Sequence, residues 1–287
     1  MSRGVLRRTP LRPPRRRAEV NPARRRALAV TRIGERFRRL REERRPGFVG
    51  FVTAGDPSLE RTVEVAGEME KAGVDVLELG VPFSDPLADG PIIQRACERA
   101  LSRGATLARV LEAVRRIRKT SDLPLLLFSY FNPLLRFGLP ALAREAAAAG
   151  VDGVLVTDLP PEEAGGWLEV ARDAGLDTVF LAAPTSPDER LRRVAGASRG
   201  FVYAISRTGV TGERDALSDD ARPLLARIKA LTREPVALGF GISTPEQVAA
   251  AASVADAAVV GSALVRFLEE HPDGDVAGQV RWLRSAI

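Results

Sequence analysis

Short apolar runs alternate with longer amphipathic stretches along the chain from Thr31 onward. The runs consist mainly of Val, Leu, Phe and Ala, which is typical of parallel strands that are covered on both faces. The predicted strands are Phe48–Thr53, Val74–Leu79, Leu123–Phe128, Gly153–Val156, Thr178–Ala182, Gly200–Ile205, Val236–Phe240 and Ala257–Val260. The pattern therefore predicts eight strands in a parallel sheet built from βα units.

The amphipathic stretches predict the helices that return the chain from one strand to the next. Ile33–Arg41 is an extra helix before the first strand, and 91–121 is long enough for two helices that separate at Gly104. The other predicted helices are Pro57–Ala72, Leu139–Ala149, Pro161–Ala174, Pro187–Val194, Asp219–Leu231, Pro245–Ala252, Ser262–Glu270 and Val276–Ser285. Eight strands with helical returns favour an α/β protein with a (β/α)₈ TIM barrel over an open doubly wound sheet, because no Gly-x-Gly-x-x-Gly motif follows the first strand.

The net charge of +6 is unevenly placed along the 287 residues. Residues 1–29 hold ten arginines and one acid, so this segment carries +9 and the other 258 residues carry −3. Its four prolines and few apolar side chains predict a disordered basic extension, because little burial can offset the entropy of ordering it. We therefore expect a barrel domain over 30–287 and a solvated, dispensable tail, which is favoured over a segment that binds nucleic acid or an acidic surface.

Several residue types that carry common chemistries are scarce. The lysines Lys71, Lys119 and Lys229 all fall on predicted helices, so no strand-end lysine is available for a Schiff base or pyridoxal phosphate. One histidine and one cysteine exclude a nitrogen–sulfur metal site, whereas a Mg²⁺ site of carboxylates stays open. The single cysteine and the lack of a membrane-length apolar run favour the cytoplasm. Carboxylates and the strand-end tyrosines Tyr130 and Tyr203 remain for catalysis.

Polar residues at the carboxyl ends of barrel strands form the expected active site. Glu78 interrupts an apolar strand, and it points into the barrel if Leu77 and Leu79 face the helices. Burial there would raise the pKa of Glu78 and suit it to proton transfer near neutrality. A carboxylate that only satisfies hydrogen bonds inside the barrel is the alternative. Asp85, in Ser-Asp-Pro, is expected to bond locally, and spacing alone leaves the role of Asp89 open.

Glycine-bearing turns follow the last two predicted strands, at Gly239–Ser243 and Gly261–Ser262. Glycines allow backbone amides to approach an anion, and the predicted helix that begins at Ser262 adds the positive end of its dipole. These two loops form the usual phosphate site of barrels. The segment Thr208–Gly212 is a third element that can close over the same anion. Glycines are also common in tight turns that bind nothing. The prediction of a phosphorylated substrate therefore rests on the position of these turns after the last two strands and not on their glycines alone.

The block Leu77–Pro91 (LELGVPFSDPLADGP) closely resembles the signature of the tryptophan synthase alpha chain family. The similarity covers about residues 30–270 and continues in order through the blocks 51–57, 130–133 and 158–160, Tyr203, the block 206–212, the GFGIS sequence and Gly261-Ser262. The resemblance implies retro-aldol cleavage of indole-3-glycerol phosphate to indole and glyceraldehyde 3-phosphate, with no cofactor in this chain.

The resemblance also implies individual roles. Glu78 matches the acid/base carboxylate that protonates indole C3 and helps deprotonate the glycerol hydroxyl, and Asp89 matches the carboxylate that binds the indole N–H. Phe51 and Tyr203 match positions that line the indole pocket. The matches to the phosphate site are Gly212, Gly241, Gly261 and Ser262, and those to the loop that closes over substrate are Arg207 and Thr211.

A partner follows from the same resemblance. In the family, indole passes to a beta chain that carries pyridoxal phosphate, within an α₂β₂ heterotetramer, and the segment around Pro82 and Asp85 resembles the part that meets it. Two other functions stay open. One is another phosphate-binding barrel enzyme of amino-acid biosynthesis; the indole-3-glycerol phosphate synthase reaction, for instance, would call for a strand-end lysine. The other is a non-catalytic activator of the beta chain, against which the intact Glu78 and Asp89 argue.

Overall fold

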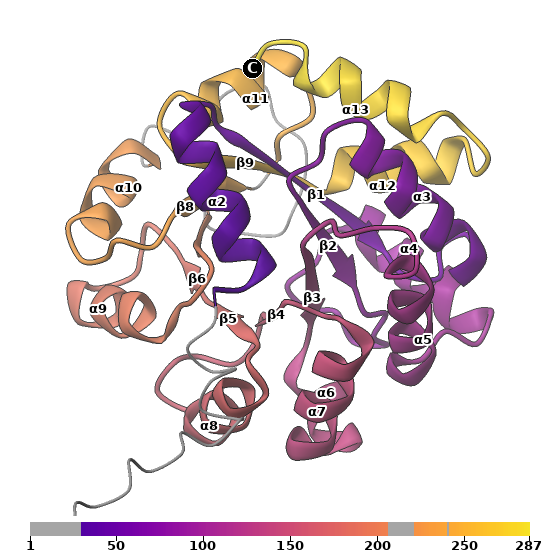
Figure 1. Cartoon of the computed structure of the whole chain (residues 1–287), viewed down its shortest axis with the longest axis horizontal. Helices are drawn as coiled ribbons and strands as arrows, with labels where there is room; N and C mark the ends of the chain where they lie inside the picture. Colours follow the sequence, from indigo (N-terminus) through magenta and orange to yellow (C-terminus); the bar gives the residue numbers. More distant parts are fainter. Residues whose placement is uncertain (1–29, 206–220, 240) are drawn as a thin grey trace, which may run out of the picture.

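The computed structural model describes residues 30–205, 221–239 and 241–287, and the predictions for residues 1–29, 206–220 and 240 lie outside them. Its strands all pair in parallel, in the order β5-β4-β3-β2-β1-β9-β8-β7-β6. The strands are β1 (Gly47–Thr53), β2 (Val76–Gly80), β3 (Leu125–Ser129), β4 (Gly153–Val156), β5 (Asp177–Val179), β6 (Leu181–Ala182), β7 (Val202–Ile205), β8 (Val236–Gly239) and β9 (Ala257–Val260). Because β5 and β6 are two pieces of one predicted strand, separated at Phe180, the sheet begins and ends on one segment. The (β/α)₈ barrel is thus confirmed (Figure 1).

Helices surround this sheet in the described part of the chain. They are α2 (Arg32–Glu43), α3 (Leu59–Lys71), α4 (Pro91–Ser102), α5 (Leu107–Ile117), α6 (Phe131–Phe137), α7 (Leu139–Ala149), α8 (Gly165–Ala174), α9 (Asp188–Ala197), α10 (Ala221–Lys229), α11 (Pro245–Ala252), α12 (Ser262–Glu270) and α13 (Val276–Arg284). None of these helices has the length and hydropathy needed to cross a bilayer. The extra N-terminal helix and the two helices predicted on 91–121 are confirmed.

Sequence patterns misplaced a few boundaries and missed one helix. The helix predicted from Pro161 begins at Gly165, because Glu163 N donates to Pro160 O in a turn. The strand predicted from Leu123 begins two residues later, since Pro124 cannot donate to the ladder. Helix α6 is too short for its periodicity to be read, and its proline lies in the first turn, where proline is tolerated.

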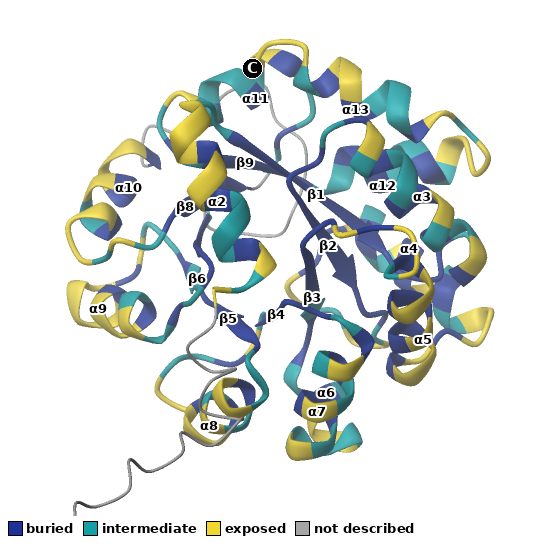
Figure 2. Cartoon of the chain, viewed as in Figure 1, coloured by how far each residue is buried: buried dark blue, intermediate teal, exposed yellow. Residues whose placement is uncertain are grey.

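Side-chain alternation along the strands divides the apolar residues into two layers. Leu77 and Leu79 face outward and pack with the helices, whereas Val76 belongs to the cluster inside the barrel. Figure 2 shows buried strands ringed by helices whose outer faces are exposed. The alternation therefore sends Glu78 into the barrel, as predicted.

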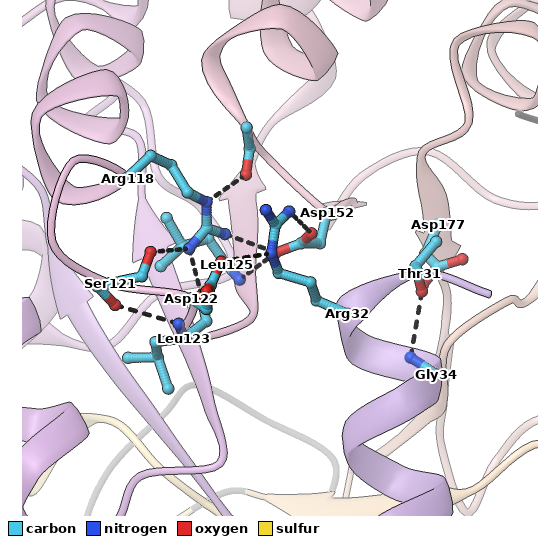
Figure 3. Close-up of polar contacts among 11 residues, drawn as sticks. Thr31, Arg32, Gly34, Arg118, Ser121, Asp122, Leu123, Leu125, Asp152 and Asp177 are labelled. Carbon is cyan, nitrogen blue, oxygen red and sulfur yellow. Dashed lines mark hydrogen bonds and ion pairs between the residues drawn. The ribbon is translucent and has the colours of Figure 1, made fainter. Parts of the chain in front are cut away.

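Helix α2 seals the amino-terminal end of the barrel. Its apolar face (Ile33, Phe37 and Leu40) joins the cluster inside the barrel. Its first turn is fixed by charge, because Arg32 Nη1 lies 3.1 Å from Asp152 Oδ1. The other carboxylate oxygen of Asp152 accepts from Arg118 at 2.6 Å and from the amide of Leu125, the first residue of β3, at 2.8 Å (Figure 3). In the described part of the chain, helix α2 thus covers the interior of the barrel at this end.

Replacing Arg118 by Met should lower the free energy of unfolding by about 3–5 kcal/mol, because it leaves the buried Asp152 carboxylate with one fewer cation. Urea denaturation measures the loss. Arg115→Met is the matched control, since Arg115 forms an exposed pair with Glu145 on a neighbouring helix and should cost about 0–1 kcal/mol. Equal losses in the two variants would contradict this account of the barrel base.

Candidate active site

A cavity of about 300 Å³ opens at the carboxyl ends of the strands. Its volume is at the lower end of the range for small-molecule sites, and it lies where barrel enzymes place their chemistry. Apart from two carboxylates, its wall is mainly aromatic, aliphatic and glycine. The lining residues are Phe51, Glu78, Leu87, Ala88, Asp89, Ile93, Phe128, Thr157, Leu181, Tyr203, Ile205, Gly241, Val259, Gly261 and Ser262.

Glu78 is the deepest charged group of the cavity. It lies mid-strand on β2, opposite Phe51 of β1 in the sheet register, and its side chain is 1% exposed. Among the described residues, no hydrogen-bond partner reaches its Oε1 atom. Burial raises the pKa of Glu78 to about 8, because ionisation in this apolar setting loses hydration without compensation. The carboxyl group can therefore both give and accept a proton near neutral pH.

Asp89 reaches the same cavity from the loop between β2 and α4. Tyr130 Oη donates to its Oδ2 at 2.9 Å, and the tyrosine oxygen in turn accepts from Ala88 N at 3.0 Å. Burial raises the pKa of Asp89 to about 6, and the bond from Tyr130 opposes part of that rise. At neutral pH, Asp89 is therefore ionised while Glu78 is mostly protonated. The two carboxyls have been given different charges by their surroundings.

Aromatic rings form the apolar wall, and glycines make room for them. Phe51 and Phe128 meet edge to face, with ring centroids 5.3 Å apart. A Cβ atom on Gly80 would lie 2.5 Å from Phe51 Cζ, and one on Gly239 would lie 2.4 Å from Tyr203 Oη. Both glycines are therefore required by the close approach of a ring to the neighbouring strand.

The other end of the cavity is built from backbone. Gly241 has a φ of 78°, which favours glycine, and Gly261 is the N-cap of α12. No side chain among the described residues caps the first turn of α12. Its amide groups, with the positive end of the helix dipole, thus face this end of the cavity beside Ser262, an arrangement that suits an anion.

A metal centre has little to build on in the parts of the chain that the structure describes. No group of three or more His, Cys, Asp or Glu side chains lies together there. The only cysteine, Cys97, is buried near the cavity, and burial raises the pKa of its thiol to about 11. The reactive groups of the described cavity are therefore its two carboxylates.

The family model for the tryptophan synthase alpha chain matches residues 37–285. The chain belongs to this family. A tryptophan synthase alpha chain from Solibacter usitatus is 53% identical over 244 residues, which cover 85% of this chain and 91% of the relative. One from Gloeobacter violaceus is 48% identical over 250 residues, which cover 87% and 91%.

Solved structures of the family share the fold. Mycobacterium tuberculosis tryptophan synthase matches with a TM-score of 0.84 and 39% identity, over 90% of this chain and 99% of that one. A chain of the α₂β₂ tryptophan synthase complex from Pyrococcus furiosus matches with a TM-score of 0.79 and 39% identity, over 84% and 99%. The family and fold suggested by the fifteen-residue block are thus confirmed.

The structure brings most of the predicted site residues together. Seven of them line the cavity, and two belong to the loop between β2 and α4, where Pro82 is buried and Asp85 is exposed. Ser84 Oγ donates to Asp85 Oδ2 at 2.5 Å, which is the local bond expected of the Ser-Asp-Pro turn. Thr211 and Gly212 lie outside the described residues. The seven lining residues are Glu78, Asp89, Phe51, Tyr203, Gly241, Gly261 and Ser262.

Tyr130 was a candidate for catalysis from the sequence, which did not predict its contact with Asp89. Its place after β3 marked it as a strand-end tyrosine, but its partner lies 41 residues away along the chain. Phe128 and Ile93 were also missed, because an apolar residue on a strand or helix carries no signal that separates a cavity wall from a core. Only the closed barrel places them beside the carboxylates.

Glu78→Gln should make the free energy of unfolding less dependent on pH. In the wild type, the pKa of Glu78 is about 8 in the folded state and 4.5 in the unfolded state. The contribution of Glu78 to the free energy of unfolding is therefore fully present below about pH 4.5 and is lost as the pH rises to 8. The variant cannot ionise, and its advantage over the wild type should grow across that window to a few kcal/mol, at roughly 1.4 kcal/mol per pH unit. Urea denaturation at several pH values measures it. A difference that does not vary with pH would refute the raised pKa.

Proposed function

We propose that this chain is the alpha subunit of a tryptophan synthase and that it cleaves indole-3-glycerol phosphate to indole and glyceraldehyde 3-phosphate. The observation that carries the proposal is the buried Glu78 carboxyl in the wall of an apolar cavity whose other end is formed by the turns at Gly241 and Gly261–Ser262. The apolar wall suits an aromatic ring, the carboxyl group suits a short polyol, and the glycine turns suit a phosphate. The family to which the chain belongs supports the same reaction.

The cleavage is a proton-balanced retro-aldol step. The protonated Glu78 gives its proton to indole C3, which weakens the bond between C3 and the glycerol carbon. As that bond breaks, the glycerol hydroxyl loses its proton and becomes the carbonyl of glyceraldehyde 3-phosphate. Glu78, now ionised, takes up that proton. A carboxyl group whose pKa lies near the working pH can serve in both directions, so Glu78 ends the cycle in its starting state.

Asp89 supplies the fixed negative charge in this proposal. Protonation of C3 places positive charge on the indole ring, which spreads to its nitrogen. The Asp89 carboxylate, held by Tyr130, accepts a hydrogen bond from the indole N–H and stabilises that charge. Stabilising charge that develops in the transition state by preorganised groups is a large contribution to catalysis. The rings of Phe51 and Tyr203 hold the indole between the two carboxylates.

The turns at Gly241 and Gly261–Ser262 bind the phosphate through backbone amides. Arg207, Thr211 and Gly212, for which the resemblance implies roles in closing over the substrate and in holding its phosphate, lie outside the described residues. We propose no metal and no cofactor in this chain, because every step above uses its own carboxylates. Pyridoxal phosphate belongs to the beta subunit. A reaction of this kind fits the cytoplasm.

The partner in this proposal is a beta subunit in an α₂β₂ assembly, as in the Pyrococcus furiosus complex. The segment 83–88 beside the cavity mouth supports it. This segment follows the buried Pro82, and it presents Asp85 and the 88% exposed side chain of Leu87 to solvent. In this proposal the partner covers Asp85 and Leu87. Indole then passes across this contact.

Replacing Glu78 by Gln should lower the rate of indole formation by about 10²–10⁴, because the amide cannot transfer the proton. Indole release from indole-3-glycerol phosphate measures the rate, with the chain alone and with a beta subunit. Binding of glyceraldehyde 3-phosphate should be retained, since its site is the backbone turns. Indole release at the wild-type rate would overturn the mechanism, and a wild type that stimulates a beta subunit without releasing indole would support the non-catalytic activator.

Replacing Tyr130 by Phe should shift the acid limb of the pH–rate profile to higher pH. The lost hydrogen bond holds the pKa of Asp89 down, so its removal leaves the carboxyl protonated over a wider range. The measurement is kcat/KM for indole formation from acid to neutral pH. Phe83→Leu is the control, because it removes the ring that packs 5.3 Å from that of Tyr130 and keeps the hydroxyl. An unshifted acid limb in Tyr130→Phe would be evidence against ionised Asp89.

A further inference from the structure

Three elements meet at one wall of the cavity. Phe51 of β1, Ile93 of α4 and Val265 of α12 belong to a small apolar cluster that is separate from the two main layers of the barrel. Each element also carries a part of the proposed site. Helix α4 begins directly after Asp89 and Gly90, and α12 begins at the proposed phosphate turn. The relative placement of these elements therefore sets the distance between the two ends of the substrate site.

Apolar packing alone does not fix that placement. Burial of apolar surface is non-directional, so it adds no preferred direction to the contact between two helices. Helices α4 and α12 pack side by side on the outside of the barrel (Figure 1). Something directional is needed to hold them in one register.

The same elements carry a group of charged residues, Asp56, Arg95, Arg99, Arg103 and Glu269, in which Arg103 Nη1 lies 3.8 Å from Asp56 Oδ1. Arg99 donates two parallel hydrogen bonds to Asp56, from Nε to Oδ1 at 2.9 Å and from Nη2 to Oδ2 at 2.7 Å. Its third nitrogen, Nη1, bonds to Glu269 Oε1 at 2.7 Å. Arg95 meets both oxygens of Glu269 at 2.8 Å. Bidentate guanidinium–carboxylate pairs fix direction as well as distance.

Arg99 is the member that touches all three elements. Asp56 follows β1 and is 6% exposed, Arg99 lies on α4, and Glu269 lies in the last turn of α12. The loop before Asp56 fits closely against α4, since a Cβ on Gly55 would lie 3.3 Å from the Cβ of Ala100. Hydrogen bonds, chiefly from Arg95 and then from Arg99, hold the pKa of Glu269 at about 2, so the group stays charged across the working pH range.

The charged group lies at a similar distance along α4 and along α12 from the ends of these helices that face the cavity. Arg99 lies about 12 Å behind the first residue of α4, and Glu269 lies about 10 Å behind the first residue of α12, at 1.5 Å per residue. The front of α4 is itself tied to the catalytic loop, because Gln94 Nε2 donates to Asp89 O at 2.8 Å. A shift at the charged group therefore reaches Asp89 and Ser262 together.

We propose that Arg99 is a positioning residue, which locks β1, α4 and α12 together so that Asp89 and the turn at Gly261–Ser262 keep the separation that indole-3-glycerol phosphate requires. This inference rests on the proposed function. Arg99 touches no substrate, and its effect appears only in ligands that span both ends of the cavity. Ligands that occupy a single end do not depend on the separation.

The experiment compares Arg99→Gln with Arg95→Gln in the full chain. Arg95 lies on the same helix and pairs with the same Glu269, but it makes no contact with Asp56 among those described, so Arg99 still joins all three elements in that variant. The kcat/KM for indole formation should fall by about 10–100-fold in Arg99→Gln, because displacement of bound groups by an ångström costs rates of that order. Arg95→Gln should stay close to the wild type.

Binding of the two products separates positioning from collapse of the pocket. Affinities for indole alone and for glyceraldehyde 3-phosphate alone should remain near wild-type values in Arg99→Gln. If Arg99→Gln does not fold, Arg99→Lys keeps the charge without the bidentate grip and should show a smaller loss of the same kind. Unchanged kcat/KM, an equal loss in Arg95→Gln, or parallel weakening of both products would overturn the proposal. Failure of the wild type to release indole would instead refute the proposed function.

Discussion

Ionising the Glu78 carboxyl inside the barrel is the constraint on which the site depends. A carboxylate at this depth has lost its hydration, and the described residues offer its Oε1 atom no hydrogen bond in return. This loss of hydration raises the pKa of Glu78 to about 8. For the same reason, the ionised carboxylate does not stabilise the folded barrel. Stability must then come from elsewhere, and the apolar layers on both sides of the sheet supply it.

The barrel keeps its two ends chemically distinct. At the amino-terminal end, buried aspartates such as Asp152 and Asp75 contact arginines and accept hydrogen bonds from strand amides. At the carboxyl end, the described residues offer the Oε1 atom of Glu78 no hydrogen bond, and Asp89 accepts one from a neutral group, Tyr130. The same residue types therefore stabilise one end and remain reactive at the other. The difference lies in whether a cation and a backbone amide are within reach.

The charged group around Arg99 extends this arrangement outward from the cavity. Arg99 is partly exposed and its partner Asp56 is buried, and the two parallel bonds between them fix direction as well as distance. The apolar cluster of Phe51, Ile93 and Val265 supplies the burial between the same elements, and Arg99 supplies direction. Burial and orientation are in this way provided by different residues.

Local patterns in the sequence determined the barrel and the inward direction of Glu78. Strand periodicity is a property of neighbouring residues, so Leu77 and Leu79 sufficed to orient the carboxyl between them, and the acidic block identified the family. Tertiary structure alone decided the bond between Asp89 and Tyr130, the aromatic wall, and the contact of Arg99 with Glu269, 170 residues away along the chain. These contacts depend on how the sheet closes and how helices pack, and no local pattern carries that information.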